Sequence, residues 1–403
     1  MGKSSSASLL LVADGTSPHS VSWAHGAAEI FPRVTLLSSR SSQRPNSLPE
    51  NVEWISGGGL RSARSHLGRL ARGAGSDTQA VKGAKPSRLV TIRHGIELAT
   101  ALTLNTAIRR TLEHASFSLV HALRLPWEGI ASAGLRQPLA PTVLSLWGSD
   151  LYSQANSSPT LGRLSKRTLD RVVGLTADCT RDIRLAHEWG LPETAVTAVI
   201  AGNMGIKKLD PDYAIESHPG ELTFTCVRGP RDSVRWENML QSFALYIAQE
   251  GNHDCKLVLA NFDSEDVHRR VREFGIQQHT EIAKHLSIQA YRDLVTRTDV
   301  ILSPTVSDGV PISLLEFMQG GASPVVGDLE SLSEFLTDGE DAALVNADDV
   351  GSILAGMNMV SSVEFQSRAT DPNSIVERRY GREESITRTQ DFYDRVLFAT
   401  ERG

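Results

Sequence analysis

The segment Ser307-Asp308-Gly309 is expected to be a flexible loop that leads from a strand into a helix. A short apolar strand is expected to end near Ser303, and Pro311 suits the first turn of the helix that follows. The N-terminus of such a helix presents free backbone N–H groups at the carboxyl end of the strand, where doubly wound sheets bind phosphates. Glycine at position 309 would let a ligand approach the backbone closely. The spacing therefore predicts a phosphate site here.

Glu316 carries the only charge in segment 312–318, which is otherwise nearly all apolar. Burying a carboxylate without a partner is costly, so this side chain needs one. Two interpretations remain open from the pattern alone. Glu316 either lies exposed on a half-buried helix or accepts hydrogen bonds from vicinal hydroxyls of a ligand.

Short apolar segments alternate with helical ones along the whole chain, and these elements must position the polar residues. In the first half we expect strands at 9–13, 34–37, 52–55, 118–122 and 142–147. In the second half we expect strands at 222–227, 256–260, 300–303 and 324–326, and a helical end at 373–402. Alternating strands and helices with apolar strands predict parallel sheets covered on both faces. The expected fold class is α/β, with two Rossmann-like, doubly wound domains.

Segment 201–221 separates the two series of strands. It is rich in Gly, Pro, Asn and His and has little periodicity, which is typical of a linker. We therefore expect an N-terminal domain at 1–203 and a C-terminal domain at 215–380, followed by a last helix at 381–403. A length of 403 residues is consistent with two or three domains at about 150 residues each.

The composition excludes several classes of protein. The 41 basic and 47 acidic side chains give a net charge of −6, which argues against a general nucleic-acid binder. The 3 cysteines lie far apart and form no CxxC motif, so a disulfide framework or zinc site is not expected. We therefore expect a cytoplasmic location. No segment approaches the roughly 20 apolar residues of a membrane-spanning helix.

Residues 60–93 form a basic segment with eight Arg and Lys side chains and a single acid, Asp77. This segment is either a solvated surface or a docking face for an anionic partner, such as lipid headgroups or a phosphorylated acceptor. It contains no aromatic residue, which argues against deep membrane insertion and against stacking on nucleic-acid bases. Peripheral contact with an anionic membrane is therefore an expectation.

These features together resemble one family of enzymes. Asp308, seven intervening residues and Glu316, followed by Gly-Gly and the expected strand at 324–328, resemble the EX7E region of retaining GT-B glycosyltransferases. Glycosyltransferase family 4 is the most similar. Further similar elements occur in order over roughly 330 residues: Asp14 with His19 and Trp23, the strand at 119–122, the WGSD sequence at 147–150, the strand end at 176–178, Glu334 and the segment at 338–345.

The resemblance implies a GT-B fold whose C-terminal domain holds a nucleotide-diphosphate sugar while the N-terminal domain holds the acceptor. Glu316 would accept hydrogen bonds from the donor ribose, and Asp308 would contact the sugar. Backbone amides near Gly309 would contact the diphosphate, and no DXD-type metal site or other cofactor is implied. The last helix would cross back to the N-terminal domain. The expected donor-binding residues are Gly15, Arg228, Arg231, Arg235, His285, Asp308, Gly309, Val310, Pro311 and Glu316.

Three positions depart from the family pattern. Arg228 matches the family's arginine, but Val234 stands where a lysine is usual, so Arg231 or Arg235 is expected to replace that cation. Asp308 stands where the family usually has Glu. Leu123 stands where many members of the family have a second histidine. The first histidine of that pair, His121, is therefore the candidate near the reacting centre.

The N-terminal candidates come from strand ends. His121 is expected either to polarise a sugar hydroxyl or to be a structural histidine. Asp150 is expected either to orient the acceptor hydroxyl or to cap the following segment. The catalytic set is therefore His121, Asp150 and Asp308, and His19 and Trp147 are the expected acceptor contacts.

The sequence thus predicts metal-independent retaining transfer of a sugar to a glycan, lipid-linked or small-molecule acceptor. Two alternatives remain. One is an inactive GT-B binding or scaffold protein, which the three departures would suit. The other is a GT-B nucleotide-sugar epimerase or hydrolase, which would consume the donor with no acceptor present.

Overall fold

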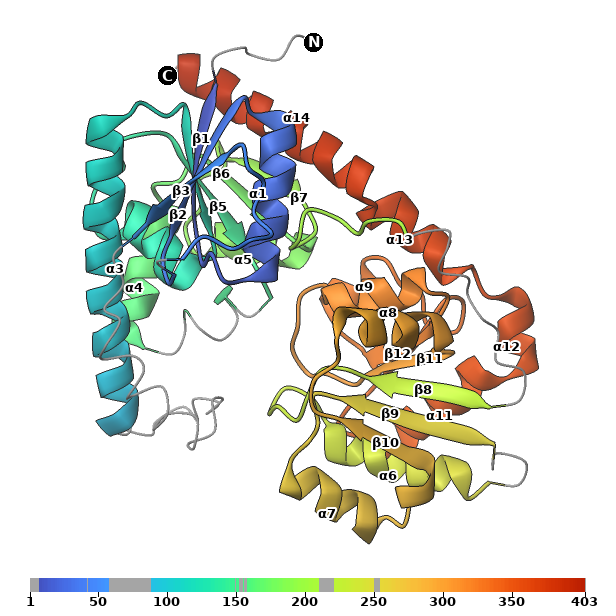
Figure 1. Ribbon diagram of the computed structural model, residues 1–403. Coiled ribbons are helices and arrows are strands. Elements are labelled where there is room, and N and C mark those ends of the chain that lie inside the picture. Colours follow the sequence, from blue (N-terminus) through green and yellow to red (C-terminus); the bar gives the residue numbers. More distant parts are fainter. Residues whose placement is uncertain are drawn as a thin grey trace. The chain divides into compact units, whose positions relative to one another are not determined.

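The computed structural model describes residues 7–41, 43–57, 88–148, 150–151, 155, 158–209, 221–249 and 254–402, without the side chains of 88–97. Contacts divide the chain into two compact units (Figure 1). Unit 1 comprises Met1–Gly205 and Ser385–Gly403, and unit 2 comprises Ile206–Glu384. Most of the basic segment predicted at 60–93 lies outside the described residues, and the side chains of the rest are not described.

Unit 1 is built on a parallel sheet of seven strands in the order β3-β2-β1-β4-β5-β6-β7. The strands are β1 (Ser8–Ala13), β2 (Arg33–Ser38), β3 (Val52–Ser56), β4 (Leu119–Leu123), β5 (Thr142–Leu146), β6 (Gly174–Ala177) and β7 (Val196–Val199). Every residue of β1, β4, β5 and β6 is buried, as expected for parallel strands covered on both faces.

Helices pack on both faces of this sheet. They are α1 (Pro18–Ile30), α3 (Arg88–His114), α4 (Pro159–Leu169), α5 (Thr180–Glu188), the π-helix η1 (Leu125–Gly134) and α14 (Arg382–Arg402). One core joins the sheet to Trp23 of α1 and to Phe392 and Tyr393 of α14. A second core joins the sheet to Leu104 and Ile108 of α3. The end of the chain is therefore part of the core of unit 1.

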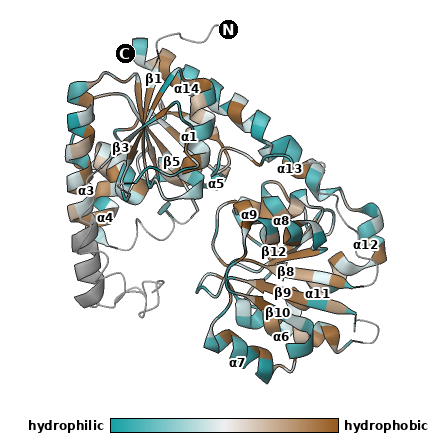
Figure 2. Ribbon diagram, in the orientation of Figure 1, coloured by the Kyte–Doolittle hydropathy of each residue, from teal (hydrophilic) through white to brown (hydrophobic). Residues whose placement is uncertain are grey.

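Unit 2 is a parallel sheet of six strands in the order β10-β9-β8-β11-β12-β13. The strands are β8 (Leu222–Cys226), β9 (Cys255–Ala260), β10 (Thr280–Ala283), β11 (Val300–Ser303), β12 (Ser323–Gly327) and β13 (Ala343–Val345). The helices are α6 (Trp236–Ile247), α7 (Glu265–Glu273), η4 (Gln277–His279), α8 (Ile288–Arg297), α9 (Ile312–Gln319), α10 (Glu330–Ser333), α11 (Val350–Ser361), α12 (Val363–Arg368) and α13 (Pro372–Tyr380). Helices α8 and α9 lie on one face and α6, α7 and α11 on the other (Figure 1). Hydrophobic residues are concentrated in the strands of both sheets (Figure 2).

The strand order reverses once in each sheet, between β1 and β4 in unit 1 and between β8 and β11 in unit 2. Ligands of open α/β sheets bind at the carboxyl edge where this reversal occurs. The prediction of two doubly wound α/β sheets is therefore confirmed, and the two reversals indicate where to look for a site.

Two local predictions differ from the structure. The helical end expected at 373–402 is two helices, because the backbone of Gly381 is extended and pairs with Ile206. The π-helix η1 was not predicted at all. No helix among the described residues is both long and apolar enough to span a membrane.

Candidate functional site

The loop between β11 and α9 is held in place by its own side chains. The Asp308 carboxylate accepts hydrogen bonds from the Gly309 backbone N–H, at 2.9 Å, and from the Arg228 guanidinium. Ser331 of α10 donates its hydroxyl to the carbonyl oxygens of Asp308, at 3.0 Å, and of Gly309, at 3.1 Å. Arg228 and Asp308, which lie 80 positions apart in the sequence, therefore meet at the carboxyl edge of β8 and β11.

Polar atoms without partners are buried at the same edge. Among the described residues, Arg228 Nε, Ser303 Oγ and Thr305 Oγ1 make no hydrogen bond. Buried polar groups in folded proteins are nearly always hydrogen-bonded, to protein or to water. A polar ligand or a bound water molecule at this edge can therefore supply the missing hydrogen bonds.

The arginines of the loop between β8 and α6 differ in whether an acidic side chain binds them. Val234, at the position of the expected lysine, is buried and pairs with Thr305 at the end of β11. Arg235 is held by the Asp348 carboxylate. Arg231 is exposed and makes no ion pair with another described residue. Arg231 is therefore the more available replacement for the missing lysine.

Glu316 lies on α9, half-buried, and its partner is a phenol. Tyr291 Oη donates to Glu316 Oε2 at 2.7 Å. Burial raises the pKa of Glu316, and the hydrogen bond from Tyr291 opposes that rise. Sequence reasoning missed Tyr291, because nothing in the sequence of α8 links it to a residue 25 positions away.

Of the other predicted donor-side residues in unit 2, Pro311 and Val310 belong to the loop before α9, and His285 lies in a different loop. Pro311 is the N-cap of α9, one position before the helix, and Val310 is buried. His285 is exposed in the loop between β10 and α8. The Gly309 amide is occupied by Asp308 in this structure, so a diphosphate would have to displace that contact.

Asp150 in unit 1 is buried, with an exposed fraction of 1%, and four donors surround its carboxylate. These are Arg124 Nε at 3.2 Å, Arg124 Nη2 at 2.8 Å, and the backbone N–H groups of Leu125 at 3.2 Å and Trp147 at 3.3 Å. In this structure the Asp150 carboxylate holds the Arg124 guanidinium and two backbone N–H groups, and its predicted role toward an acceptor stays a prediction.

Arg124 was missed by sequence reasoning, and its backbone is unusual. Its φ of 96° and ψ of 140° lie in a region that is essentially restricted to glycine. Its side chain remains 38% exposed beside the buried Asp150. Strained residues of this kind, like π-helices, are concentrated at functional sites, and η1 begins at the next residue.

His121 does not have the geometry of a catalytic group. The residue is fully buried in β4, with Nδ1 2.6 Å from Tyr393 Oη and Nε2 2.9 Å from Ser145 Oγ. Burial lowers its pKa to about 3, so the ring is neutral. Of the two predicted roles, only the structural one fits: His121 ties α14 to the sheet.

His19 and Trp147, the predicted acceptor contacts, do lie together. Their rings meet edge to face with centroids 5.8 Å apart. Loss of hydration and the positive charge of Arg124 lower the pKa of His19, although part of the residue remains exposed. Gly15 is buried under Trp54, and a Cβ there would stand 2.4 Å from the Trp54 ring. Glycine at this position is thus explained by packing.

Unit 1 contains another buried acid, Glu128 of η1. Ser39 donates to Glu128 Oε1 of η1 at 2.5 Å, and burial raises the pKa of Glu128. Glu128 is the only charge in the apolar segment 125–134, as Glu316 is in 312–318. The signal that singled out Glu316 would also have found Glu128.

One group of possible metal ligands occurs among the described residues, at Asp178, Cys179 and Asp182. Arg181 forms an ion pair with Asp182 at 2.8 Å. Burial raises the pKa of the Cys179 thiol, which keeps it protonated. The Arg181 guanidinium already neutralises one of the two carboxylates of this group, which makes it a poor cation site.

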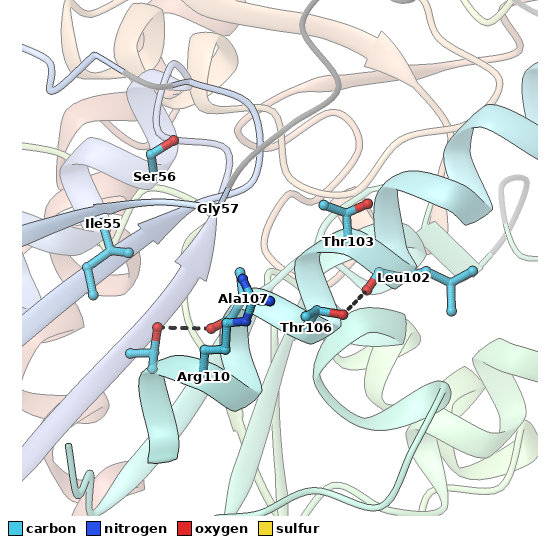
Figure 3. Close-up of a pocket in the computed structure, with 9 residues that line it drawn as sticks. Ile55, Ser56, Gly57, Leu102, Thr103, Thr106, Ala107 and Arg110 are labelled. Atoms are coloured by element: carbon cyan, nitrogen blue, oxygen red, sulfur yellow. Dashed lines mark hydrogen bonds between the residues drawn. The ribbon is translucent and has the colours of Figure 1, made fainter. Parts of the chain in front are cut away.

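A cavity of about 670 Å³ lies between β3 and α3 in unit 1 (Figure 3). The lining residues are Ile55, Ser56, Gly57, Leu102, Thr103, Thr106, Ala107, Arg110 and Thr111. Thr106 and Thr111 donate their hydroxyls to carbonyl groups of their own helix. None of the predicted site residues lines this cavity.

Comparison with known proteins links the second unit to a sequence family. Residues 226–361 match the family described as Glycosyl transferases group 1. The matched range includes Arg228, Tyr291, Asp308 and Glu316. Comparison with curated protein sequences finds none that is similar.

Solved structures resemble the whole chain. Sucrose-phosphate synthase from Thermosynechococcus elongatus has a TM-score of 0.71 at 11% identity and covers 98% of this chain and 100% of its own. The Anabaena protein HepE, in complex with UDP and glucose, has a TM-score of 0.65 at 12% identity and covers 96% of this chain and 100% of its own. An α,α-trehalose-phosphate synthase from Burkholderia vietnamiensis has a TM-score of 0.66 at 12% identity, and the match covers 98% of this chain and 100% of the synthase chain. At these identities the similarity establishes the fold, which is the predicted GT-B fold.

Proposed function

We propose that this chain, a glycosyltransferase of group 1 with a GT-B fold, transfers a sugar from a nucleotide-diphosphate sugar to an acceptor hydroxyl with retention of configuration and without a metal ion. The observation that carries the proposal is the cluster at the β8–β11 edge. Arg228 and Glu316 match the family pattern, Asp308 supplies an acid where the family usually has Glu, and Arg228 and Asp308 are in contact. HepE, with the same fold, was solved with UDP-glucose, which makes this sugar nucleotide the first donor to test.

In unit 2 we assign donor binding to these residues. Glu316 accepts hydrogen bonds from the ribose, and Asp308 contacts the transferred sugar. Arg228 and Arg231 meet the charge of the diphosphate, and the amides near Gly309 become available once Asp308 turns to the sugar. Preorganised cations and amides of this kind stabilise the charge that develops on the leaving diphosphate.

In unit 1 we assign the acceptor to the edge formed by His19, Trp147 and Arg124. Asp150 holds Arg124 in its strained conformation. Because His121 is buried and neutral, it takes no proton from the acceptor. The phosphate of the donor accepts that proton in this proposal, and the protein contributes mainly position and charge.

The acceptor is a glycan, a lipid-linked molecule or a small metabolite. Contact of the 60–93 segment with an anionic membrane remains part of the proposal and rests on its charge alone. Binding to anionic vesicles but not to neutral ones would support this contact. Equal binding to both would remove it.

Thermal shift with UDP, GDP, ADP and CDP and their glucose conjugates tests the function. A ligand that binds the native state raises the unfolding midpoint by mass action. We expect one nucleotide to raise it, Glu316→Ala to abolish the rise, and Glu273→Ala on the exposed end of α7 to keep it. Binding without turnover over a broad acceptor panel would support the scaffold alternative, and donor consumption with no acceptor would support the epimerase or hydrolase.

A further inference from the structure

We propose that Tyr291 is a positioning residue that orients the Glu316 carboxylate and thereby makes donor binding selective for ribose. The inference rests on the proposed function, because it assumes that Glu316 meets the donor ribose. Its structural basis is the contact between α8 and α9, where Tyr291 Oη lies 2.7 Å from Glu316 Oε2.

The Tyr291 ring is fixed from a second side. It packs edge to face against Phe317, with ring centroids 5.7 Å apart and planes at 87°. Phe317 is fully buried in α9, so it provides a rigid support. A phenol held in this way has little freedom to move, and its single O–H points at the carboxylate.

The two oxygens of Glu316 are therefore unequal. Oε2 accepts from Tyr291, whereas Oε1 accepts no hydrogen bond from another described residue. Within the described part of the chain, no Lys, Arg or His forms an ion pair with this carboxylate, so the phenol is its one polar contact. A fixed carboxyl group with an unoccupied oxygen is suited to accept from a pair of vicinal hydroxyls.

Losing the phenol changes what the carboxylate can do. Without the hydrogen bond, the Glu316 side chain can rotate. A half-buried carboxylate also loses the one contact that favours its charged form. Ribose recognition then weakens, whereas contacts to the diphosphate and the base do not depend on Tyr291.

Isothermal titration of the full chain with UDP and with 2′,3′-dideoxy-UDP tests this role. The variants are Tyr291→Phe and, as a matched control, Tyr246→Phe on α6, which removes a phenol hydrogen bond to Ser361 of 2.9 Å in the same unit. We expect Tyr291→Phe to weaken UDP binding about tenfold, as for loss of a hydrogen bond to a charged group. We expect no change for dideoxy-UDP and no change for either ligand in the control.

The remaining outcomes distinguish failure of this inference from failure of the proposed function. Equal weakening of both ligands in Tyr291→Phe would show a packing role only and overturn the proposal, as would unchanged UDP binding. If the unaltered chain binds UDP and dideoxy-UDP equally, Glu316 does not read the ribose, and the proposal is overturned although nucleotide binding stands. If it binds neither these ligands nor GDP, ADP or CDP, the proposed function fails and the inference with it.

Discussion

The polar edges of the two units use the same residue types in opposite ways. In unit 2 the ion pair of Arg228 and Asp308 is partly accessible, with exposed fractions of 20% and 16% for the two side chains. In unit 1 the pair of Arg124 and Asp150 has an accessible cation, at 38%, and a buried acid, at 1%. Unit 2 therefore presents both charges to a ligand, whereas unit 1 presents only the cation.

The difference teaches that a carboxylate at a strand end has two uses. An acid that keeps accessible surface can exchange its partner for a substrate, as we propose for Asp308. An acid enclosed by donors, such as Asp150, instead fixes the group beside it. Removing the acids should therefore affect binding in unit 2 and stability in unit 1.

The largest expected effect comes from Asp150→Ala. The backbone N–H groups of Leu125 and Trp147 would lose their acceptor, whereas the Arg124 cation keeps solvent contact, so unit 1 should lose about 2–4 kcal/mol of stability. Asp308→Ala is the matched control and should lose about 1 kcal/mol or less, because its pair keeps solvent contact. Urea unfolding followed by tryptophan fluorescence measures this well, since five of the 6 tryptophans, all except Trp236, lie in unit 1. Equal losses in the two variants would break the comparison.

Much of the fold could be predicted from the sequence, because apolar strands and their loops are local patterns. The strand at 9–13 became β1 at Ser8–Ala13, and the strand at 300–303 is β11. The division of roles within the site could not be predicted in the same way. Whether Asp150 or Arg124 faces solvent depends on contacts between β4, η1 and β5 that no short sequence pattern encodes.

His121 illustrates the limit most clearly. Its position in an apolar strand fits a catalytic and a structural residue equally well. The deciding partner, Tyr393, lies 272 positions away on α14. Tyr291 and Glu316 show the same limit over a shorter distance, since the sequence marked the acid and not the phenol.

Lowering the pH should destabilise unit 1 through His121. Its pKa is about 3 when folded and about 6.5 when unfolded, so the unfolded chain binds the extra proton. The stability that the neutral ring gives is complete above pH 6.5 and is lost as the pH falls toward 3. At pH 5 the loss is about 2 kcal/mol.

The measurement is urea unfolding at several pH values, with His121→Gln for comparison. Glu128, whose pKa is raised by burial, acts in the opposite sense, and it is present in both proteins. The difference between them therefore isolates the histidine. Identical slopes of stability against pH would show that His121 is not a buried neutral base.

The strained backbone of Arg124 predicts an unusual order of variants. Arg124→Ala and Arg124→Gly both remove the cation, but only glycine adopts a φ of 96° without strain. The glycine variant should therefore be more stable than the alanine variant by about 1–3 kcal/mol. At Arg163, which is exposed inside α4, the order should be reversed, because glycine within a helix costs about 1 kcal/mol relative to alanine. Urea unfolding of the four variants decides the point, and an alanine variant that is the more stable at position 124 would contradict the strain.

The smallest expected effect compares two buried serines that hold the two edges. Ser331 donates to the backbone carbonyls of Asp308 and Gly309, and Ser39 donates to the carboxylate of Glu128. Loss of a hydrogen bond to a carbonyl that keeps other partners costs about 1 kcal/mol, and leaving a buried carboxyl oxygen without its donor costs more. Ser331→Ala should therefore cost little stability and instead raise the KM for the donor, because the loop that carries Asp308 loosens. Ser39→Ala should cost about 2 kcal/mol in unit 1 and leave the KM for the donor unchanged. If Ser331→Ala lowered stability more than Ser39→Ala did, the loop of unit 2 would be a structural element, and the contrast between a binding edge and a positioning edge would be lost.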